Sequence, residues 1–400
     1  MKRLILLSLA VAFALPTTAH AQLIMTMSNG WSLSFSGNVN AFWVFTARDS
    51  GPLGRSVSNS SIRTGLLPAF ANFDAKGKEA GLDIGVHFGF APEIQNGGNA
   101  HDQFGTQIDM REVYLTVGSP KWGQILAGRE LGLFSRQNIL NDMTLFGVGA
   151  VGPGLEQAGG TTLGRIGYGY LYANFNAQVT YSSIGKKPFQ FNVGLFQPSV
   201  IPGRYSVTSM PRLEAEVTLK PKMSGRTKLL VWGGVEWQTL KRSPAIDSSA
   251  TAAGGTVGVR VDMSQLAVVA SYYMGSGIGG TGIGGALVNS IDGFGFQSGA
   301  FANDGSGRKF DGGYLQGTYT ANKKTTVGVS WGYSREKLAG TGSSDASNGV
   351  VAQWSAFTGG IYHQWTKSTK LVAEYTREVN HRAFNQANVG VIAAGVMLFF

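Results

Sequence analysis

The sequence lacks cysteine, and beyond its N-terminal segment it also lacks long apolar runs. With no cysteine among 400 residues, disulfide bonds and thiolate metal ligands are excluded. After residue 21 there is no run of about 18 consecutive apolar residues, the length that would indicate a membrane-spanning helix. Glycine is abundant, with 58 residues and no collagen-like period. These features leave room for a glycine-rich chain built from strands.

The first 21 residues have the pattern of a secretory signal peptide. Lys2 and Arg3 form a basic start, residues 4–15 form a short apolar core, and Ala19-His20-Ala21 is an A-x-A cleavage site. The apolar core is shorter than the roughly 20 residues that a spanning helix needs. We therefore expect cleavage after Ala21 and a mature chain of residues 22–400. Loss of Lys2 and Arg3 would lower the formal net charge from +10 to +8.

Apolar and polar residues alternate through most of the mature chain. Side chains of a strand point to opposite faces with period two, so each such stretch has one apolar face and one small or charged face. The clearest stretches are 31–45, 82–90, 213–219, 257–263, 327–333 and 388–400. Mean hydropathy is close to zero, as expected when half of each strand faces lipid and half faces water. The pattern favours an all-β fold, a transmembrane antiparallel β-barrel, in one domain over 22–400.

The connections between these stretches alternate between short polar turns and longer loops rich in Gly, Ser and Asn. Eight longer loops predict sixteen strands, because such barrels have short turns on one rim and long loops on the other. Residues 165–196 leave the number open, since they hold three alternating pieces. Asn174 is either a bulge or a turn there, and residues 185–188 are the other candidate turn. Eighteen strands therefore stay open.

Residues 107–130 resemble the general-diffusion porins of Gram-negative outer membranes. That family has a strand with an arginine and a glycine, a short turn, and a return strand that leads into its third loop. The corresponding residues here are Arg111, Gly118, Trp122-Gly123 and Gly128-Arg129, although Val117-Gly118 stands where the family more often has Gly-Leu. A long segment, 131–163, comes next, and residues 164–168 are similar to the family's following strand.

The resemblance implies a sixteen-stranded homotrimeric barrel whose third loop folds inward and narrows a water-filled pore. It also implies a wall of arginines opposite acidic residues of the loop, an electrostatic filter for small hydrophilic solutes. Arg136 in the same loop would offset one of the acids. The wall candidates are Arg63, Arg111, Arg129 and Arg165, and the loop candidates are Asp142 and Glu156. The alternative is that these arginines make local ion pairs in the lumen wall without a role in selectivity.

The expected location is the outer membrane of a Gram-negative bacterium, with the lipid bilayer as partner. The net charge suggests an anion preference, because a basic lumen raises the local anion concentration. Aromatic residues at strand ends are candidates for the membrane interface: Trp31, Trp122, Trp365, Tyr375 and Phe400.

The sequence gives no sign of catalysis, and we expect no enzyme, cofactor, metal site or nucleic-acid partner. The histidines are scattered without metal-ligand spacing, and the glycine motif at residues 275–280 is followed by more glycine rather than by a helix. Two other functions remain open. One is a channel selective for a sugar or a carboxylate, and the other is a plugged barrel that binds a partner through its loops.

Overall fold

The computed structural model describes most of the chain after residue 22. The described residues are 23–50, 55–94, 108–152, 160–185, 187–200, 205–242, 249–281, 287–289, 300–302, 304–340, 343, 345, 352–382 and 385–400. The expected signal peptide and its cleavage site lie outside the described residues. No helix within these ranges is long and apolar enough to cross a membrane.

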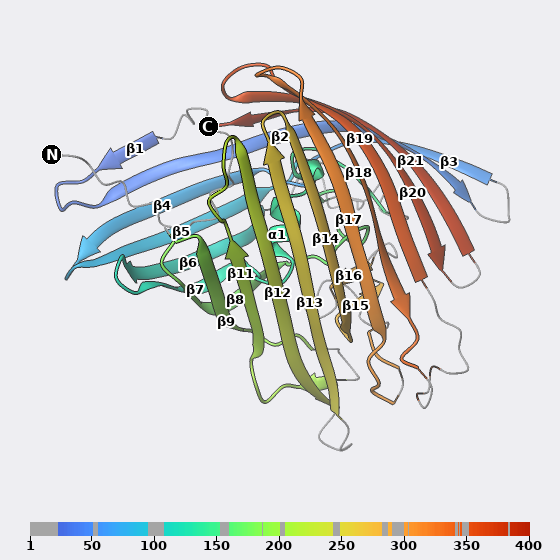
Figure 1. Ribbon diagram of the computed structural model, residues 1–400, viewed down its shortest axis with the longest axis horizontal. Helices are drawn as coiled ribbons and strands as arrows, with labels where there is room; N and C mark the ends of the chain where they lie inside the picture. The colour runs from blue at the N-terminus through green and yellow to red at the C-terminus, as the bar shows by residue number, and fades with distance from the viewer. Residues whose placement is uncertain are drawn as a thin grey trace.

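Antiparallel strands form one sheet that closes on itself, because β21 pairs with β2 along residues 38–50. Figure 1 shows the strands as a curved wall. A separate short pair is formed by β15 (Gly279–Thr281) and β16 (Leu287–Asn289). The strands of the wall are β1 (Leu23–Thr26), β2 (Ser32–Ser50), β3 (Arg55–Arg63), β4 (Phe70–Glu79), β5 (Leu82–Pro92), β6 (Ile108–Ser119), β7 (Gly123–Leu131), β8 (Phe175–Ser182), β9 (Phe189–Phe196), β10 (Tyr205–Val207), β11 (Arg212–Leu219), β12 (Thr227–Arg242), β13 (Ser249–Met263), β14 (Leu266–Ser276), β17 (Lys309–Thr320), β18 (Thr325–Lys337), β19 (Ala352–Gln364), β20 (Thr369–Arg382) and β21 (Asn385–Phe399).

The barrel has sixteen strand positions, as the number of long loops predicts. Three short strands share a position with a neighbour. Both β3 and β4 pair with one edge of β2, β1 continues the line of β21 along its other edge, and β10 continues the line of β11 along β12. The ambiguous residues 165–174 form no strand, because β8 begins only at Phe175 and turns into β9 around residues 183–188. Eighteen strands are thereby ruled out.

Alternation sets the two surfaces of the wall. Trp331, Phe357 and Tyr375 lie on exposed outward positions, while their chain neighbours Ser330, Thr358 and Glu374 are buried on the inward side. Burying the backbone of a strand in lipid requires every N–H and C=O to be paired, and closure of the sheet meets that requirement without an edge.

The five aromatic residues predicted for the membrane interface occupy different places. Tyr375 lies on the outward face of β20, and Trp122 and Trp365 lie in short turns with 36% and 60% of their surface exposed. The ring of Phe400 packs 5.1 Å from the ring of Phe35. Trp31 lies close to Gly77, whose missing side chain leaves room for the indole.

Candidate functional site: the barrel interior

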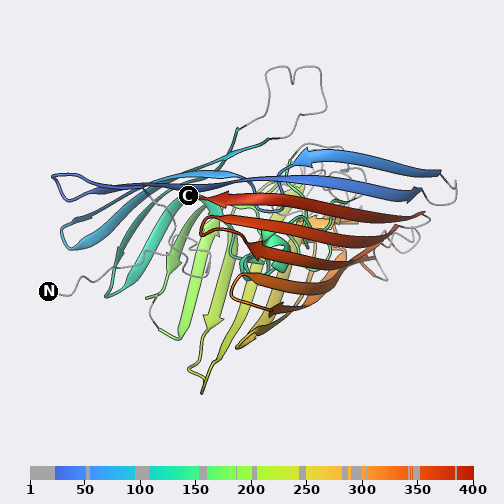
Figure 2. The same ribbon diagram turned by 90° about the horizontal axis from the view of Figure 1, so that it is seen from above.

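The connection between β7 and β8 runs through the inside of the barrel. We call it the inner segment and define it as residues 132–174, of which 132–152 and 160–174 are described. It contains the helix α1 (Arg136–Leu140) and a 3-10 helix, η3 (Met143–Phe146). Figures 1 and 2 show α1 and the adjoining coil within the ring of strands. This is the third long connection of the barrel.

Inward-facing glutamates of the wall bind the inner segment through its backbone. Glu214 on β11 and both Glu374 and Glu378 on β20 each accept hydrogen bonds from two consecutive backbone N–H groups. A carboxylate that accepts two N–H groups satisfies donors that would otherwise be buried without a partner. The donors are Leu133 (2.7 Å) and Phe134 (2.8 Å) for Glu214, Val148 (2.7 Å) and Gly149 (2.8 Å) for Glu374, and Val151 (2.7 Å) and Gly152 (3.2 Å) for Glu378.

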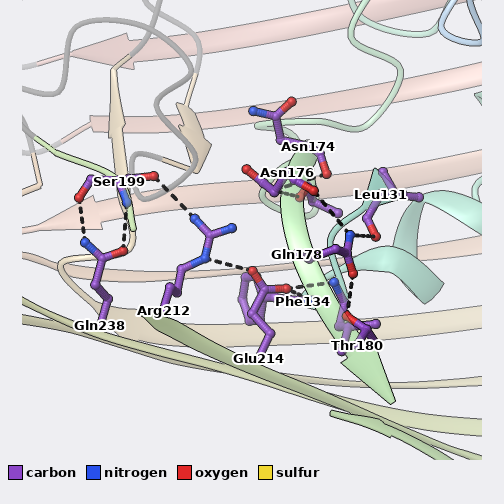
Figure 3. A network of polar contacts seen from close by, with 12 residues as sticks. Leu131, Phe134, Asn174, Asn176, Gln178, Thr180, Ser199, Arg212, Glu214 and Gln238 are labelled. Carbon is purple, nitrogen blue, oxygen red and sulfur yellow. Dashed lines mark hydrogen bonds and ion pairs between the residues drawn. The ribbon is translucent and has the colours of Figure 1, made fainter. Parts of the chain in front are cut away.

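The anchor at Glu214 belongs to a wider polar network, shown in Figure 3. Arg212 Nε lies 2.9 Å from Glu214 Oε1, and its Nη1 donates to Ser199 Oγ at 3.3 Å. Gln238 on β12 holds the backbone of Ser199 in turn, with its amide donating to the carbonyl at 2.6 Å. The guanidinium of Arg212 is fully buried and also lies 5.4 Å from the centroid of the Phe196 ring. The start of the inner segment is therefore fixed to β11.

Further bonds attach the middle of the segment to β12 and β17. Gln316 on β17 accepts from the backbone N–H of Met143 at 2.7 Å and donates to the carbonyl of Asn141 at 3.0 Å. Trp232 on β12 donates its indole N–H to Asn138 Oδ1 at 2.8 Å. The segment thus contacts strands from β11 round to β20.

Close backbone approach makes these contacts possible. A Cβ atom at Gly332 on β18 would lie 2.2 Å from the carbonyl oxygen of Tyr168, and one at Gly147 would lie 2.0 Å from Glu374 Oε1. Gly149 and Gly164 cross each other within the segment, with φ of 59° and 56° that favour glycine. Part of the high glycine content therefore lets the segment pack against the wall and itself.

Two of the predicted wall arginines hold the inner segment. Arg63, the last residue of β3, is 1% exposed and donates to the carbonyls of Gly160 at 2.9 Å and Thr161 at 3.1 Å. Arg165 is not on a wall strand, contrary to the prediction, because the chain stays in the inner segment until Phe175. Its guanidinium donates to the carbonyl of Ser330 on β18 at 2.5 Å and to that of Ala356 on β19.

The other two predicted wall arginines lie on opposite faces. Arg129 pairs with Val113 and Ala177 on the outward phase of β6 to β8, so its prediction as a lumen residue is wrong. The neighbouring Glu130 takes the inward, buried position, and adjacent residues alternate between the two faces because the register of β7 has no bulge here. Arg111 does face the interior, where it donates to the hydroxyl of Tyr172 at 3.4 Å.

Of the three predicted loop charges, Asp142 forms bonds within the segment and Arg136 bonds the wall. Asp142 Oδ1 accepts from the backbone N–H of Thr144 at 2.9 Å, and its Oδ2 accepts from the hydroxyl of Tyr170 at 2.9 Å. Burial raises the pKa of the Asp142 carboxyl, against the opposing effects of Arg165 and the hydrogen bonds. Arg136 makes a two-pronged ion pair with Glu216 on β11, at 2.7 and 3.1 Å. Glu156 lies outside the described residues.

A cavity of about 380 Å³ lies between the inner segment and the wall formed by β2 and β4 to β7. The inner segment contributes apolar side chains, among them Ile139, Leu140 and Phe146, and the chain end adds Phe399. The ammonium of Lys370 lies 4.1 Å from the centroid of the Phe146 ring. The charged side chains that line the cavity are Asp74, Lys76, His87, Arg111, Glu112 and Glu130.

A histidine links two of these carboxylates. His87 Nδ1 lies 3.1 Å from Asp74 Oδ1, and its Nε2 lies 3.4 Å from Glu112 Oε2. The ring of Tyr114 stacks on the imidazole with centroids 4.7 Å apart, and Lys76 Nζ lies 3.7 Å from Asp74. Sequence reasoning does not single out this group, although each member lies on the polar phase of its strand. The sequence does show that β4, β5 and β6 each carry charged residues. That these residues are neighbours across the sheet becomes apparent only once the register of the three strands is known.

Comparison with known proteins shows which family the sequence matches. A family model described as Gram-negative porin matches residues 7–382. No curated protein matches the sequence.

Solved structures with the same fold include three outer-membrane proteins. The outer-membrane channel DcaP of Acinetobacter baumannii is 15% identical over 94% of this chain and 99% of its own, with a TM-score of 0.65. An anion-selective porin from Comamonas acidovorans is 12% identical over 92% of this chain and 100% of its own, with a TM-score of 0.61. OmpF of Salmonella typhi, in complex with daunomycin, is 13% identical over 93% of this chain and 100% of its own, with a TM-score of 0.54. At these identities the likeness concerns the fold, whereas the family match covers nearly the whole sequence. The chain therefore belongs to the Gram-negative porins, and it is a β-barrel channel of the outer membrane for passive diffusion.

Proposed function

We propose that small hydrophilic solutes cross this barrel beside the inner segment, and that the cavity along β2 and β4 to β7 is the narrowest part of their path. The observation that carries this proposal is the asymmetric attachment of the segment. Most of its wall anchors lie on β11 to β20, and Arg63 at the end of β3 holds its later part. Along β4 to β7 the cavity lies between the segment and the wall, which meet there at the 3.4 Å contact of Arg111 with the Tyr172 hydroxyl.

We further propose a weak anion preference. After the expected loss of Lys2 and Arg3 the formal net charge falls from +10 to +8, and Arg111, Lys76 and His87 line the cavity. Three carboxylates on the same wall offset these cations, so the preference is expected to be small. The filter differs from a simple arginine ladder, because Arg63 and Arg165 are used to hold the inner segment. The Comamonas protein is an anion-selective porin, so an anion preference is compatible with this fold.

The assembly and export of the protein follow as parts of the same proposal. We expect a homotrimer, cleavage after Ala21, and contacts of Trp31, Trp122, Trp365, Tyr375 and Phe400 with the membrane interface. A trimer would bury part of the outward apolar surface, and aromatic side chains suit the boundary between lipid and water.

Planar-bilayer conductance tests the proposal. The refolded mature protein is inserted from detergent, and single-channel steps and reversal potentials are recorded in a KCl gradient. Steps in groups of three, with a chloride-to-potassium permeability ratio slightly above one, are the expected result. Absence of conductance from protein that is folded by circular dichroism would overturn the channel proposal and favour the plugged barrel. A ratio clearly below one would overturn the anion preference alone.

A further inference from the structure

We propose that the cavity beside the inner segment binds small zwitterions that carry an apolar side chain, such as hydrophobic amino acids. The inference rests on the proposed function in that the cavity is taken to lie on the solute path. It goes further by naming a class of solute that would be retained there, and by assigning the two ends of that solute to particular side chains.

Arg111 and Glu112 carry the argument. They are consecutive residues of β6, and strand alternation would send their side chains to opposite faces of the wall. Both nevertheless line the cavity. The cause is a bulge, because Gly89 on β5 pairs with Glu112 and the next residue, Phe90, pairs with Met110, so that Arg111 is the extra residue. Bulges commonly re-aim a side chain beside a functional site.

This bulge sets a cation and an anion next to each other at the surface of one cavity. A zwitterion presents the complementary pair, since its carboxylate can accept from the Arg111 guanidinium while its ammonium donates to the Glu112 carboxylate. The remaining charges of the cavity are also mixed, with Lys76 and His87 against Asp74 and Glu130. An ion of a single sign would meet like charges on this wall, whereas a dipolar solute can be oriented along it.

The opposite side of the cavity is apolar. Ile139, Leu140 and Leu145 come from the inner segment, together with the ring of Phe146, and Phe399 closes the same side. These side chains belong to or pack against the anchored core of the segment, so they form a fixed surface. An apolar side chain of the solute placed against them would be removed from water, at a gain of roughly 25 cal/mol per Å².

Size is consistent with a small amphipathic solute. The volume of about 380 Å³ lies near the lower end of the roughly 300–1,000 Å³ that is common for ligand pockets. Such pockets are mostly apolar with a few polar groups that fix the orientation of the ligand. A hydrated disaccharide would leave the apolar side of this cavity without a matching partner.

Equilibrium dialysis with folded, detergent-solubilised protein tests the inference directly. The probes are phenylalanine, glycine (a zwitterion without an apolar side chain), 3-phenylpropionate (the anion alone) and phenethylammonium (the cation alone). We expect saturable binding of phenylalanine, with each of the other three bound about tenfold more weakly, since each lacks one complementary group. Arg111→Gln and Glu112→Gln should each weaken phenylalanine binding by about tenfold.

A matched control and a second readout separate the outcomes. Arg260→Gln removes an arginine that is paired with Asp262 on β13 and does not line the cavity, and it should leave phenylalanine binding unchanged. Folding of every variant is checked by circular dichroism and by heat-modifiable migration in gels. Equal binding of all four probes, or loss of binding in the control alone, would overturn the inference. Conductance without phenylalanine binding would overturn the zwitterion site and leave the channel proposal intact. Phenylalanine binding without conductance would overturn only the channel proposal.

Discussion

Inward-facing carboxylates on two sides of the barrel have the same chemistry but different surroundings. On β11 and β20, Glu214, Glu374 and Glu378 are buried and accept backbone N–H groups of the inner segment. On β4 and β6, Asp74 and Glu112 face a cavity and share the imidazole of His87. Strand alternation places all five on the inside, and the path of one connection decides which of them are structural.

The two sets of carboxylates therefore have different roles in the lumen. Carboxylates bound to backbone N–H groups stabilise the position of the inner segment, because a broken bond would leave a buried donor without a partner. Carboxylates beside the cavity border the proposed solute path, where their charge would act on passing ions. Mutations of the two sets should therefore change different properties.

The largest effect is expected for Glu374→Ala. The change leaves the backbone N–H groups of Val148 and Gly149 without their acceptor, at about 1–3 kcal/mol for each group if water does not replace it. Unfolding in urea, followed by intrinsic fluorescence in lipid vesicles, should show the lower free energy of unfolding. Single-channel records should also become noisier. Asp49→Asn is the control, because its pair with Arg377 lies on the exposed outer surface and should contribute less than about 1 kcal/mol. Equal losses in the two variants would contradict the structural role of Glu374.

A substitution at the closest approach of wall and segment should have the next largest effect. Gly332→Ala would place a methyl group 2.2 Å from the carbonyl oxygen of Tyr168, and relieving such overpacking typically costs about 1–3 kcal/mol. The same unfolding measurement applies. Gly317→Ala, one strand away, has no atom within 4 Å of the added methyl and should be neutral or nearly so. If both variants unfold like the parent protein, the inner segment is not held against β18.

Two glutamate-to-glutamine substitutions, one in each set of carboxylates, remove a charge with little change of shape and compare the two sets by ion selectivity. Glu112→Gln should raise the chloride-to-potassium permeability ratio roughly threefold. A unit charge about 7 Å from a passing ion contributes about 0.6 kcal/mol in water and about half of that after screening in about 0.1 M salt, and it acts with opposite sign on the two ions. Glu378→Gln should leave the ratio unchanged, because this side chain binds the N–H groups of Val151 and Gly152. Reversal potentials in a KCl gradient measure both. The reverse result, a shift only in Glu378→Gln, would place the solute path on the other side of the segment.

The fold could be predicted from sequence because its signal is local. Alternation over single strands indicates which side chains face lipid, and the number of long connections favours sixteen strands while residues 165–196 leave eighteen open. Residues 165–174 are ambiguous in the sequence for a physical reason, since a buried coil with tyrosines and glycines has the same composition as a strand of this barrel. Only their contacts with the wall, such as that of Arg165 with Ser330, distinguish the two.

The site could be predicted only in part, because it depends on long-range register. The porin resemblance places Arg63 on the lumen side, but its partners, Gly160 and Thr161, lie about a hundred residues away in sequence. The same resemblance has Asp142 facing the wall, whereas its carboxylate bonds within the segment. Arg111 reaches the cavity through a bulge that a single strand sequence does not reveal.

The smallest effect is expected for Arg129→Gln. This variant distinguishes the outward position that the strand register gives Arg129 from the lumen position that the porin motif implies. The resemblance to porins suggests that Arg129 should contribute to the lumen field, and its removal would then lower the anion preference. The register places it between Val113 and Ala177 on the outward phase, where a wall of low dielectric and the screening of the lumen electrolyte separate it from passing ions. The permeability ratio of Arg129→Gln should therefore equal that of the parent protein, while Arg111→Gln lowers it. A fall of the same size in both variants would mean that β7 carries Arg129 inward, and Glu130 would then have to leave its buried position.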